Sequence, residues 1–488
     1  MAAAPPGSSP RFRAPDTMLI IFSIIVLAAV ATWFVPPGAF EKATIEVEGA
    51  GEREVVVPGS FDYLEREDEG WFDRVRGTLG IILLAPILGI TDPDAVPIIA
   101  FVLLVGGAFA VLQKTGAVDA GLRRLVGAAE QSRAVQLALI PLFMTLFSLG
   151  GATFGMAEET IPFVLIFVPL ALALGYDSIT GVAIPFVGSG AGFAGAFLNP
   201  FTVGVAQGIA EVPLFSGVPF RIGLWVCTTA AATGFVMWHA ARVKRDPKRS
   251  PTYALDQKKR AEEGLDAPAA DAALTASQRN VLLVFAVGLV VLVFGVLEFG
   301  WYINEIAALF VALGIVMGLV GGLGGNGTAM AFQEGARDLV ATALIIGLAR
   351  GILIVLQDAQ VIDTILYALA STVGDFGPAV AASTMYGAQT VLNFFVPSGS
   401  GQAALTMPLM APLADLVGVS RQTAVLAFQM GDGFTNLIIP TSAVLMGALS
   451  LANVPWQAWA RWILPLQLVL FAMGVVALVI AVSIGWTG

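Results

Sequence analysis

The stretch Gly150-Gly151-Ala152-Thr153-Phe154-Gly155-Met156-Ala157-Glu158-Glu159 lies in the middle of the apolar run 134–175. Its glycines allow a tight chain reversal, and its polar residues interrupt what would otherwise be one long apolar helix. A bilayer tolerates non-helical backbone only where protein or a water-filled cavity satisfies the exposed polar groups. The run is therefore either two spans or one re-entrant hairpin, and the polar tip favours the hairpin.

A second version of the same unit lies about half the chain length away. With a shift of 244 positions Val111-Leu112-Gln113 matches Val355-Leu356-Gln357, and with a shift of 243 positions Pro169 matches Pro412. Paired interruptions in the two halves of a polytopic chain point to the binding site of a secondary transporter. The duplicated unit contains four polar, glycine-rich patches, at 150–159, 188–202, 397–402 and 431–442.

The composition is that of a polytopic membrane protein. Hydrophobic residues make up 57% of the chain and charged residues 12%, whereas soluble domains carry about 25% charged residues. Many apolar runs reach the ~20 residues that cross ~30 Å of hydrocarbon. One cysteine excludes an intramolecular disulfide, and one histidine speaks against a transition-metal site. No nucleophile elbow or catalytic His–Asp pair indicates an enzyme.

The charges are segregated along the chain. The segment Glu41–Arg76 holds eleven acidic and five basic residues, and Arg242–Arg279 holds nine of the 25 basic residues. The positive-inside rule places the second segment in the cytoplasm and the first outside. The N-terminus is then inside and the C-terminus outside. Charge that sets orientation gives no reason to expect a nucleic-acid partner.

These signals predict an all-α polytopic membrane protein built from two repeats. Because 97–113 runs inward and its counterpart 339–356 runs outward, the repeats are inverted, as alternating access requires. The linker, rich in charge, Ala and Pro, should be flexible or loosely helical without a core of its own. The expected parts begin with a tail 1–16 and a first repeat 17–241. This repeat contains an outer loop 41–77, with an interfacial or re-entrant helix from about Trp71, then a hairpin 134–175 and a broken helix 179–210. A linker 242–279 leads to a second repeat 280–488, with a hairpin 378–417 and a broken helix 422–452.

The first hairpin tip offers several groups for binding. Gly151 and Gly155 expose backbone donors, and Thr153 adds a hydroxyl. Glu158 and Glu159 are expected one turn into the returning half-helix, where the helix dipole favours a carboxylate. Two adjacent carboxylates at membrane depth are costly unless they face protein or water. These two carboxylates either cap the helix or lie in the aqueous interface, or at least one of them contacts a cationic group, a coupling cation or a proton.

The second tip keeps the bend and replaces the charge. With the shift of 243, Gly401-Gln402 takes the place of Glu158-Glu159. Hydroxyls, amides and free N–H groups at a half-helix N-terminus suit a carboxylate. The residues expected to bind substrate or ion here are Ser398, Gly399, Ser400 and Gln402.

The two broken spans complete the candidate site. Proline removes a backbone donor and unwinds the helix before it, and unwound carbonyls with Asn and Thr oxygens suit Na⁺. Alternatively, small residues there serve only close helix packing. Asp432 is a cation ligand, a proton carrier or a partner of a substrate amine. The candidate residues are Ser189, Gly190, Asn199 and Thr202 in the first break, and Asp432, Thr435, Asn436, Thr441 and Ser442 in the second.

Two further features stand apart from the patches. Arg350 is a lone cation in a span, where it either forms a salt bridge within the scaffold or contacts an anionic substrate. Trp456, Trp459 and Trp462, spaced by three, suit one face of a helix that leads into the final span. We expect these tryptophans to be membrane-interface anchors.

At these residues the chain resembles the C4-dicarboxylate carriers of the DcuC type, and most closely their YfcC branch of amino-acid antiporters. The resemblance rests on 155–163 (GMAEETIPF), 332–352 and 397–442. It implies a bacterial inner-membrane homodimer of the ion-transporter superfamily, with a fixed scaffold domain and a transport domain that moves like an elevator. Several superfamily members bind Na⁺ and carboxylate through Ser-Asn-Thr tips. This chain has none, and offers Thr153, Ser398 and Ser400 instead.

The sequence thus predicts a secondary active transporter of a small polar metabolite, without a resident cofactor. Coupling is to Na⁺, to H⁺ or by exchange, and oxygen-rich loops favour Na⁺. An amino acid suits both the acidic residues and the carboxylate receptor, so it is preferred, and a C4-dicarboxylate is the alternative substrate. A passive channel is the alternative of another class and would need a continuous lumen.

Overall fold

The computed structural model describes residues 17–47, 51–65, 70–93, 95–263, 274–301, 303–371 and 377–488. The tail 1–16 and part of the linker, 264–273, lie outside these residues. The described chain is helical apart from four short strands, and eight of its helices are long and apolar enough to cross a membrane. The expectation of a helical, polytopic membrane protein is confirmed.

The first half contains the elements expected for one repeat, including a break inside each predicted interruption. The helices are α1 (Thr17–Ala31), α2 (Trp71–Thr91), α3 (Ala95–Lys114), α4 (Ala117–Gln131), α5 (Arg133–Phe154), α6 (Thr160–Ala173), α7 (Ser178–Ala194), the π-helix η1 (Pro200–Gly204), α8 (Val205–Ile209) and α9 (Val218–Arg245).

The second half follows a short linker region with the 3₁₀-helix η2 (Pro247–Arg249) and helix α10 (Tyr253–Glu263). Its helices are α11 (Ala276–Phe299), α12 (Ile303–Val320), α13 (Gly324–Asp338), α14 (Val340–Asp358), α15 (Ile362–Ser371), α16 (Pro378–Phe395), α17 (Gly399–Leu416), α18 (Arg421–Thr435), α19 (Ala443–Leu451) and α20 (Trp456–Ser483).

The two halves use corresponding helix contacts. Helices α5 and α6 both pack against α7, which packs against α9; likewise α16 and α17 both pack against α18, which packs against α20. Each half also packs on the other: α12 and α13 of the second half pack on α3 of the first, and α1 and α2 of the first half pack on α14 of the second. Helices α7 and α18 meet between the halves. The two halves therefore share a pattern of helix contacts.

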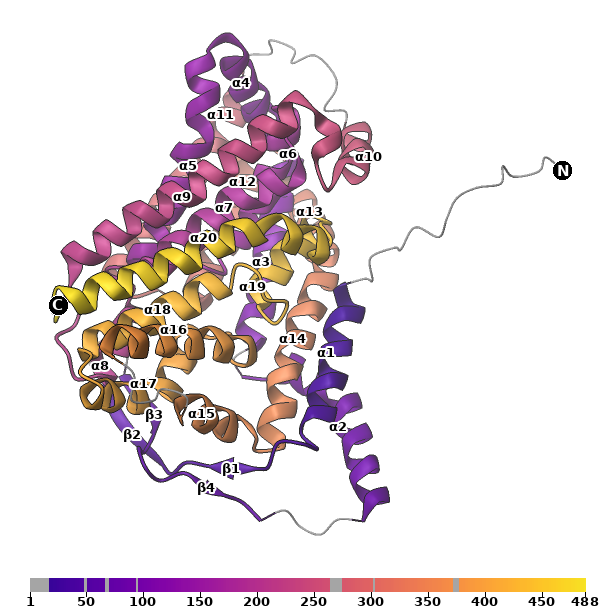
Figure 1. Ribbon diagram of the computed structural model, residues 1–488. Helices are drawn as coiled ribbons and strands as arrows, with labels where there is room; N and C mark the ends of the chain where they lie inside the picture. The colour runs from indigo at the N-terminus through magenta and orange to yellow at the C-terminus, as the bar shows by residue number, and fades with distance from the viewer. Residues whose placement is uncertain are drawn as a thin grey trace, which may run out of the picture.

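The segment between α1 and α2 differs from the expected loop because it contains strands. Strand β1 (Gly38–Ala39) pairs with β4 (Asp62–Tyr63), and β2 (Lys42–Val47) pairs with β3 (Gly51–Val56), both antiparallel. Phe40 and Val56 are buried with side chains of α15 and α16. Figure 1 shows these strands at one end of the molecule and α4 and α10 at the other, so the acidic and basic segments lie far apart.

Helix α2, expected to be interfacial or re-entrant, ends against the middle of α14. Asp92, which follows its last residue, forms an ion pair with Arg350, 2.8 Å from Nε to Oδ1. Gly89 lies against the backbone of Gly347, where a larger side chain would collide with the carbonyl. The expected scaffold salt bridge of Arg350 is thus present, and its partner belongs to the first half.

The linker, expected to be flexible or loosely helical, contains the helices η2 and α10 over 246–263, and this part docks on the bundle. Lys259 Nζ donates to the Ser178 hydroxyl, 2.7 Å away, and to the Ala452 carbonyl oxygen, 2.5 Å away. Arg260 donates to the Tyr176 carbonyl oxygen at 2.8 Å, and Ser178 donates to buried Asp256. The composition of the linker did not predict this docking, because the polar side chains of the linker form hydrogen bonds to the bundle instead of to water.

The centre of this linker contact is Asp177, in the turn between α6 and α7. His239 Nε2 lies 2.9 Å from one carboxylate oxygen, and Ser250 donates to the same oxygen at 2.7 Å. Thr180 donates to the other oxygen through its N–H and its hydroxyl. Burial alone raises the pKa of Asp177, but the hydrogen bonds and charge of His239 and the bonds from Thr180 outweigh it and hold the pKa below its usual range.

Asp177→Asn should lower the free energy of unfolding by about 3 kcal/mol at neutral pH, because it removes one partner of a buried pair. A carboxyl whose pKa falls on folding stabilises the fold above its unfolded pKa, near 4, and loses this effect as the pH falls through its folded pKa. The difference between wild type and variant should therefore shrink only in strongly acidic buffer. Thermal melting in detergent across pH measures it.

Asp246→Asn is the matched control, because Asp246 is half-exposed and pairs only with exposed Arg249 among the described residues. Such a surface pair contributes about 0–1 kcal/mol. Equal destabilisation by the two variants, or a difference that grows as the pH falls, would contradict the role given to Asp177.

Candidate functional site

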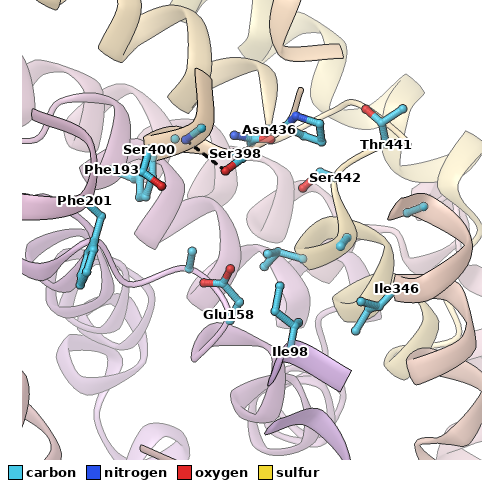
Figure 2. A pocket seen from close by; sticks show the side chains of 18 of the residues that line it. Ile98, Glu158, Phe193, Phe201, Ile346, Ser398, Ser400, Asn436, Thr441 and Ser442 are labelled. Atoms are coloured by element: carbon cyan, nitrogen blue, oxygen red, sulfur yellow. Dashed lines mark hydrogen bonds between the residues drawn. The ribbon is translucent and has the colours of Figure 1, made fainter. Parts of the chain in front are cut away.

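All four predicted breaks open onto one cavity of about 690 Å³. Its walls also include the start of α3 and the middle of α14. Figure 2 shows the Glu158 side chain directed into the space, with Ser398 and Asn436 across from it and Ile98 and Ile346 beside it. The cavity therefore lies between the interrupted helices and the α3–α14 wall.

The first break separates α5 from α6. Gly155 adopts a φ of 74°, a left-handed conformation that favours glycine, and a Cβ there would collide with the Asn199 amide. Glu158 and Glu159 were expected inside the returning helix, but they form the turn before its first residue, Thr160. Glu159 is buried and its carboxylate accepts from the Ala157 N–H at 2.9 Å. Glu159 thus satisfies the local backbone, while Glu158 lines the cavity.

The second break, between α16 and α17, presents a helix N-terminus to the same cavity. Ser398 precedes α17 and its hydroxyl accepts from the Gly401 N–H at 3.4 Å, the dashed line in Figure 2. Ser400 and the glycines of the tip line the cavity. The first turn of a helix has unsatisfied N–H groups and a partial positive charge. This tip therefore offers donors without a formal charge.

The tip of α17 touches both halves of the protein. A Cβ on Gly399 would meet the Thr202 methyl group and lie 3.3 Å from the Asp432 carboxylate oxygen Oδ2. Asp432 has no exposed surface, and its other oxygen accepts from Asn436 Nδ2 at 3.0 Å. Asn393 Nδ2 donates to the Asp432 carbonyl oxygen at 3.1 Å. Thr202 and Asp432 thus meet at Gly399.

The second broken helix is held by tryptophans, which corrects their expected role. Trp459 is fully buried and donates to the Leu437 carbonyl oxygen at 2.9 Å, and Trp456 donates to the Ile438 carbonyl oxygen at the same distance. Trp462 is also buried. Trp456 and Trp459 are therefore not interface anchors, because their indole N–H groups satisfy carbonyls that the break of α18–α19 leaves free. The buried indole N–H of Trp462 has no partner among the described residues.

Unpaired buried polar atoms concentrate around the breaks. Asp432 Oδ2 and Gln402 Oε1 have no hydrogen-bond partner within the described chain, although Gln402 Nε2 donates to Gln389 at 2.7 Å. Buried polar groups normally find partners, so such atoms indicate places for water, ion or ligand. Further orphaned atoms among the predicted residues belong to Asn199, Thr202 and Thr441.

Sequence reasoning missed part of this polar group, namely Gln389, Thr390, Asn393 and Gln429, which also carry unpaired atoms. Gln389 and Asn393 lie one turn apart on α16, so a pair of polar residues at spacing four in an apolar arm was the available signal. Gln429 Nε2 donates to the Phe193 carbonyl oxygen at 2.5 Å and joins α18 to the end of α7.

The structure brings most of the predicted residues together. The predicted residues that line the cavity are Gly155, Glu158, Ser189, Gly190, Thr202, Ser398, Gly399, Ser400, Asn436, Thr441 and Ser442. Those that do not line it are Gly151, Thr153, Glu159, Asn199, Gln402, Asp432 and Thr435.

Residues that do not line the cavity have structural contacts of their own. The Thr153 and Thr435 hydroxyls donate to carbonyl oxygens of their own helices, Leu149 and Gly431. Gly151 packs on the backbone at Ser189. Arg350, which the sequence left between scaffold and substrate, both pairs with Asp92 and lines the cavity.

Close packing between α5 and α7 sets the position of the first break. A Cβ on Gly192 would overlap the Ser148 carbonyl oxygen. Ser148 in turn joins α5 to α9, because its hydroxyl lies 2.6 Å from the Thr229 hydroxyl and accepts from Trp225 at 2.9 Å. The glycine therefore lets two helices approach to backbone contact.

Gly192→Ala should destabilise the protein by about 1–3 kcal/mol, because α5 and α7 must separate to admit the methyl group. Gly234→Ala in α9 is the control, since a Cβ there has no neighbour within 4 Å among the described atoms. Thermal melting in detergent should show a lower midpoint for the first variant and an equal or higher one for the second. Equal midpoints would refute the backbone contact.

Comparison with known proteins gives relatives of nearly full length. The model of the family described as C4-dicarboxylate anaerobic carrier (DcuC) matches residues 14–483. The Escherichia coli (strain K12) protein named "Putative basic amino acid antiporter YfcC" is 41% identical over 500 residues, covering 98% of each chain. An uncharacterized Haemophilus influenzae protein is 29% identical over 516 residues, covering 97% of this chain and 98% of its own. These matches confirm the resemblance read from the motifs.

Two solved transporters are similar at low identity. The Alcanivorax borkumensis YdaH transporter is 16% identical with a TM-score of 0.44, covering 97% of this chain and 99% of its own. Neisseria gonorrhoeae MtrF, described with a class of antimetabolite efflux pumps, is 17% identical with a TM-score of 0.40, covering 96% of this chain and 95% of its own.

Proposed function

The chain belongs to the C4-dicarboxylate anaerobic carrier (DcuC) family of membrane transporters, and we propose that it is a secondary active transporter of a small polar metabolite, an amino acid or a carboxylate. The observation that carries this proposal is the cavity onto which all four helix breaks open. Discontinuous helices place substrate and ion sites in transporters, and a cavity of this size suits a small molecule.

An amino acid fits the polarity of the cavity best. Glu158 comes from the first break and supplies the carboxylate for an ammonium or guanidinium group. Ser398, Ser400 and the N-terminus of α17 come from the second break and suit a carboxylate. Figure 2 shows Glu158 and Ser398 on facing walls. The name of the Escherichia coli relative, a basic amino acid antiporter, agrees with this assignment.

A C4-dicarboxylate is the second candidate because the family description names it. Arg350 on the α14 wall and the N-terminus of α17 would then receive the two carboxylates. Two features stand against this: an ionised Glu158 carboxylate would face the same space, and Arg350 is already paired with Asp92. Like charges in a confined site are repulsive, so the diacid is the weaker candidate.

Na⁺ is the favoured coupling ion, with H⁺ as the alternative. Na⁺ is a hard cation, and the buried oxygens of Asp432, Gln402 and Asn393 that lack a donor suit such an ion. Asp432 reaches Gly399 of the α17 tip, so an ion at Asp432 would hold that tip against α18. Ion binding and substrate binding would thereby favour the same arrangement.

Alternating access is proposed to follow an elevator movement in a homodimer of the bacterial inner membrane, with the N-terminus inside and the C-terminus outside. The moving part comprises α5–α9 and α16–α20, and the fixed part comprises α1–α3 and α11–α14. The cavity lies between these groups, and the corresponding contacts of the two halves suit inverted repeats that exchange conformations.

In proteoliposomes, preloaded unlabelled basic or neutral amino acid should accelerate uptake of the same labelled amino acid several-fold, and more so with Na⁺ on both sides. Exchange through one alternating site produces this counterflow, whereas flux through a channel follows the gradient alone. Preloaded succinate serves as the comparison. Acceleration by succinate alone would assign the protein to dicarboxylates, and no acceleration by any preloaded compound would refute carrier-type exchange of these compounds.

Glu158→Gln should raise the half-saturation concentration for a basic amino acid at least about tenfold, because a charge-assisted hydrogen bond contributes about 1.5–3 kcal/mol. The melting temperature without ligand should stay near that of wild type. Glu159→Ala is the neighbouring variant and should instead lower the melting temperature, since it removes the acceptor of the Ala157 N–H. Weaker binding in the second variant, with unchanged stability, would reverse the two assignments.

A further inference from the structure

The end of α9 that joins the linker forms a basic groove outside the transport cavity. Its volume is about 720 Å³, and it is lined by Trp238, Ala241, Arg242, Arg245, Asp246 and Arg249. Trp238, Arg242 and Arg245 follow at intervals of four and three residues, which places them along one face of α9. Arg249 joins them from the 3₁₀-helix η2, which follows α9. The groove thus gathers three guanidinium groups and one indole at a single place.

Its charge is not balanced within the described chain. Arg249 pairs with Asp246 at 3.1 Å. Arg242 lies over the Trp238 ring at 5.5 Å from its centre, and neither Arg242 nor Arg245 has a carboxylate partner among the described residues. Three cations against one anion leave a net charge of about +2 in the groove, which calls for an anionic ligand.

The backbone that carries the arginines of the groove is held by hydrogen bonds. The Arg249 N–H donates to the Asp246 carbonyl oxygen and the Asp246 N–H to the Arg242 carbonyl oxygen. The next residue, Ser250, is buried and donates to Asp177. The turn from α9 into η2 is therefore anchored in the bundle, so the arginines start from a defined backbone instead of a loose chain.

The position of the groove on α9 suits a lipid headgroup. Trp238 is 56% exposed on α9, and the same helix exposes Ile222 and Val226 towards its other end. An apolar exposed face of a membrane helix contacts acyl chains, and an exposed tryptophan followed by arginines marks the interface. The arginines belong to the basic segment assigned to the cytoplasm, so the groove meets the inner leaflet.

We propose that the groove formed by Trp238, Arg242, Arg245 and Arg249 binds the phosphate of an anionic phospholipid of the inner leaflet. Guanidinium groups hold phosphate oxygens through paired hydrogen bonds. The indole of Trp238 lies beside the glycerol region, and basic pockets on the cytoplasmic side of membrane helices recognise such headgroups. A soluble phosphate compound shares the anion but has no acyl chain for the exposed face of α9.

Native mass spectrometry of the protein with phosphatidylglycerol and with phosphatidylcholine tests the proposal. Wild type should retain phosphatidylglycerol preferentially. The variant R242Q/R245Q/R249Q should lose this preference by at least about tenfold in binding constant, because each basic residue contributes to the attraction. Its melting temperature in phosphatidylcholine should match that of wild type, which shows that the fold is intact.

The matched control is R133Q/R279Q/R337Q, which removes the same charge from exposed arginines of the same predicted side. It should bind phosphatidylglycerol within about twofold of wild type. Equal loss in both variants would mean diffuse electrostatic attraction and would overturn the groove. An equal thermal shift of wild type by glycerol 1-phosphate and by phosphatidylglycerol would assign the groove to a soluble phosphate and overturn the lipid.

Discussion

Every helix break in this fold faces the constraint that backbone groups freed inside a bilayer need partners. The protein meets it with groups from distant parts of the chain. Ser189 donates to the Met156 carbonyl oxygen across the first break, and the N–H groups of Phe197 and Leu198 both donate to the Ala152 carbonyl oxygen. At the last break the indole of Trp459 does the same for Leu437. Each break is therefore stable only inside the assembled bundle, which explains why four of them lie at one cavity.

The same constraint explains the close helix packing. Small residues at Gly192 and Gly433 bring backbones into contact, α7 against α5 and α18 against α7. Close approach lets side chains such as Gln429 reach the end of another helix. Polar atoms that find no partner, such as Asp432 Oδ2, then remain at the junction of the halves. Tight packing thus leaves unsatisfied polar atoms beside the cavity, and the proposed ion binding would depend on the same contacts that stabilise the fold.

The sequence predicted the breaks closely because glycine, proline and polar residues in apolar runs have direct backbone consequences. The hairpin expected at 378–417 corresponds to α16 and α17, and the broken helix expected at 422–452 to α18 and α19. Roles that depend on tertiary partners could not be predicted from the sequence. Trp459 looked like an interface residue, and the linker looked flexible, because burial and distant acceptors decide both. The outer strands were missed although Lys42–Val47 alternates between polar and apolar residues, which is the pattern of a half-buried strand. Its partner Gly51–Val56 lacks this alternation.

The two halves keep a common geometry but divide the polar chemistry unequally. The first break contributes a carboxylate, Glu158, whereas the second contributes hydroxyls and helix N–H groups at Ser398 and Ser400. Symmetric chemistry at two tips would suit a ligand with two like ends. Unequal tips suit a ligand with one cationic and one anionic end, because each end then has its own receptor and the reversed orientation is repelled. The Arg350 charge does not upset this balance, since its ion pair with Asp92 offsets it. Under the proposed function, the different chemistry of the two tips would therefore orient the ligand in the cavity.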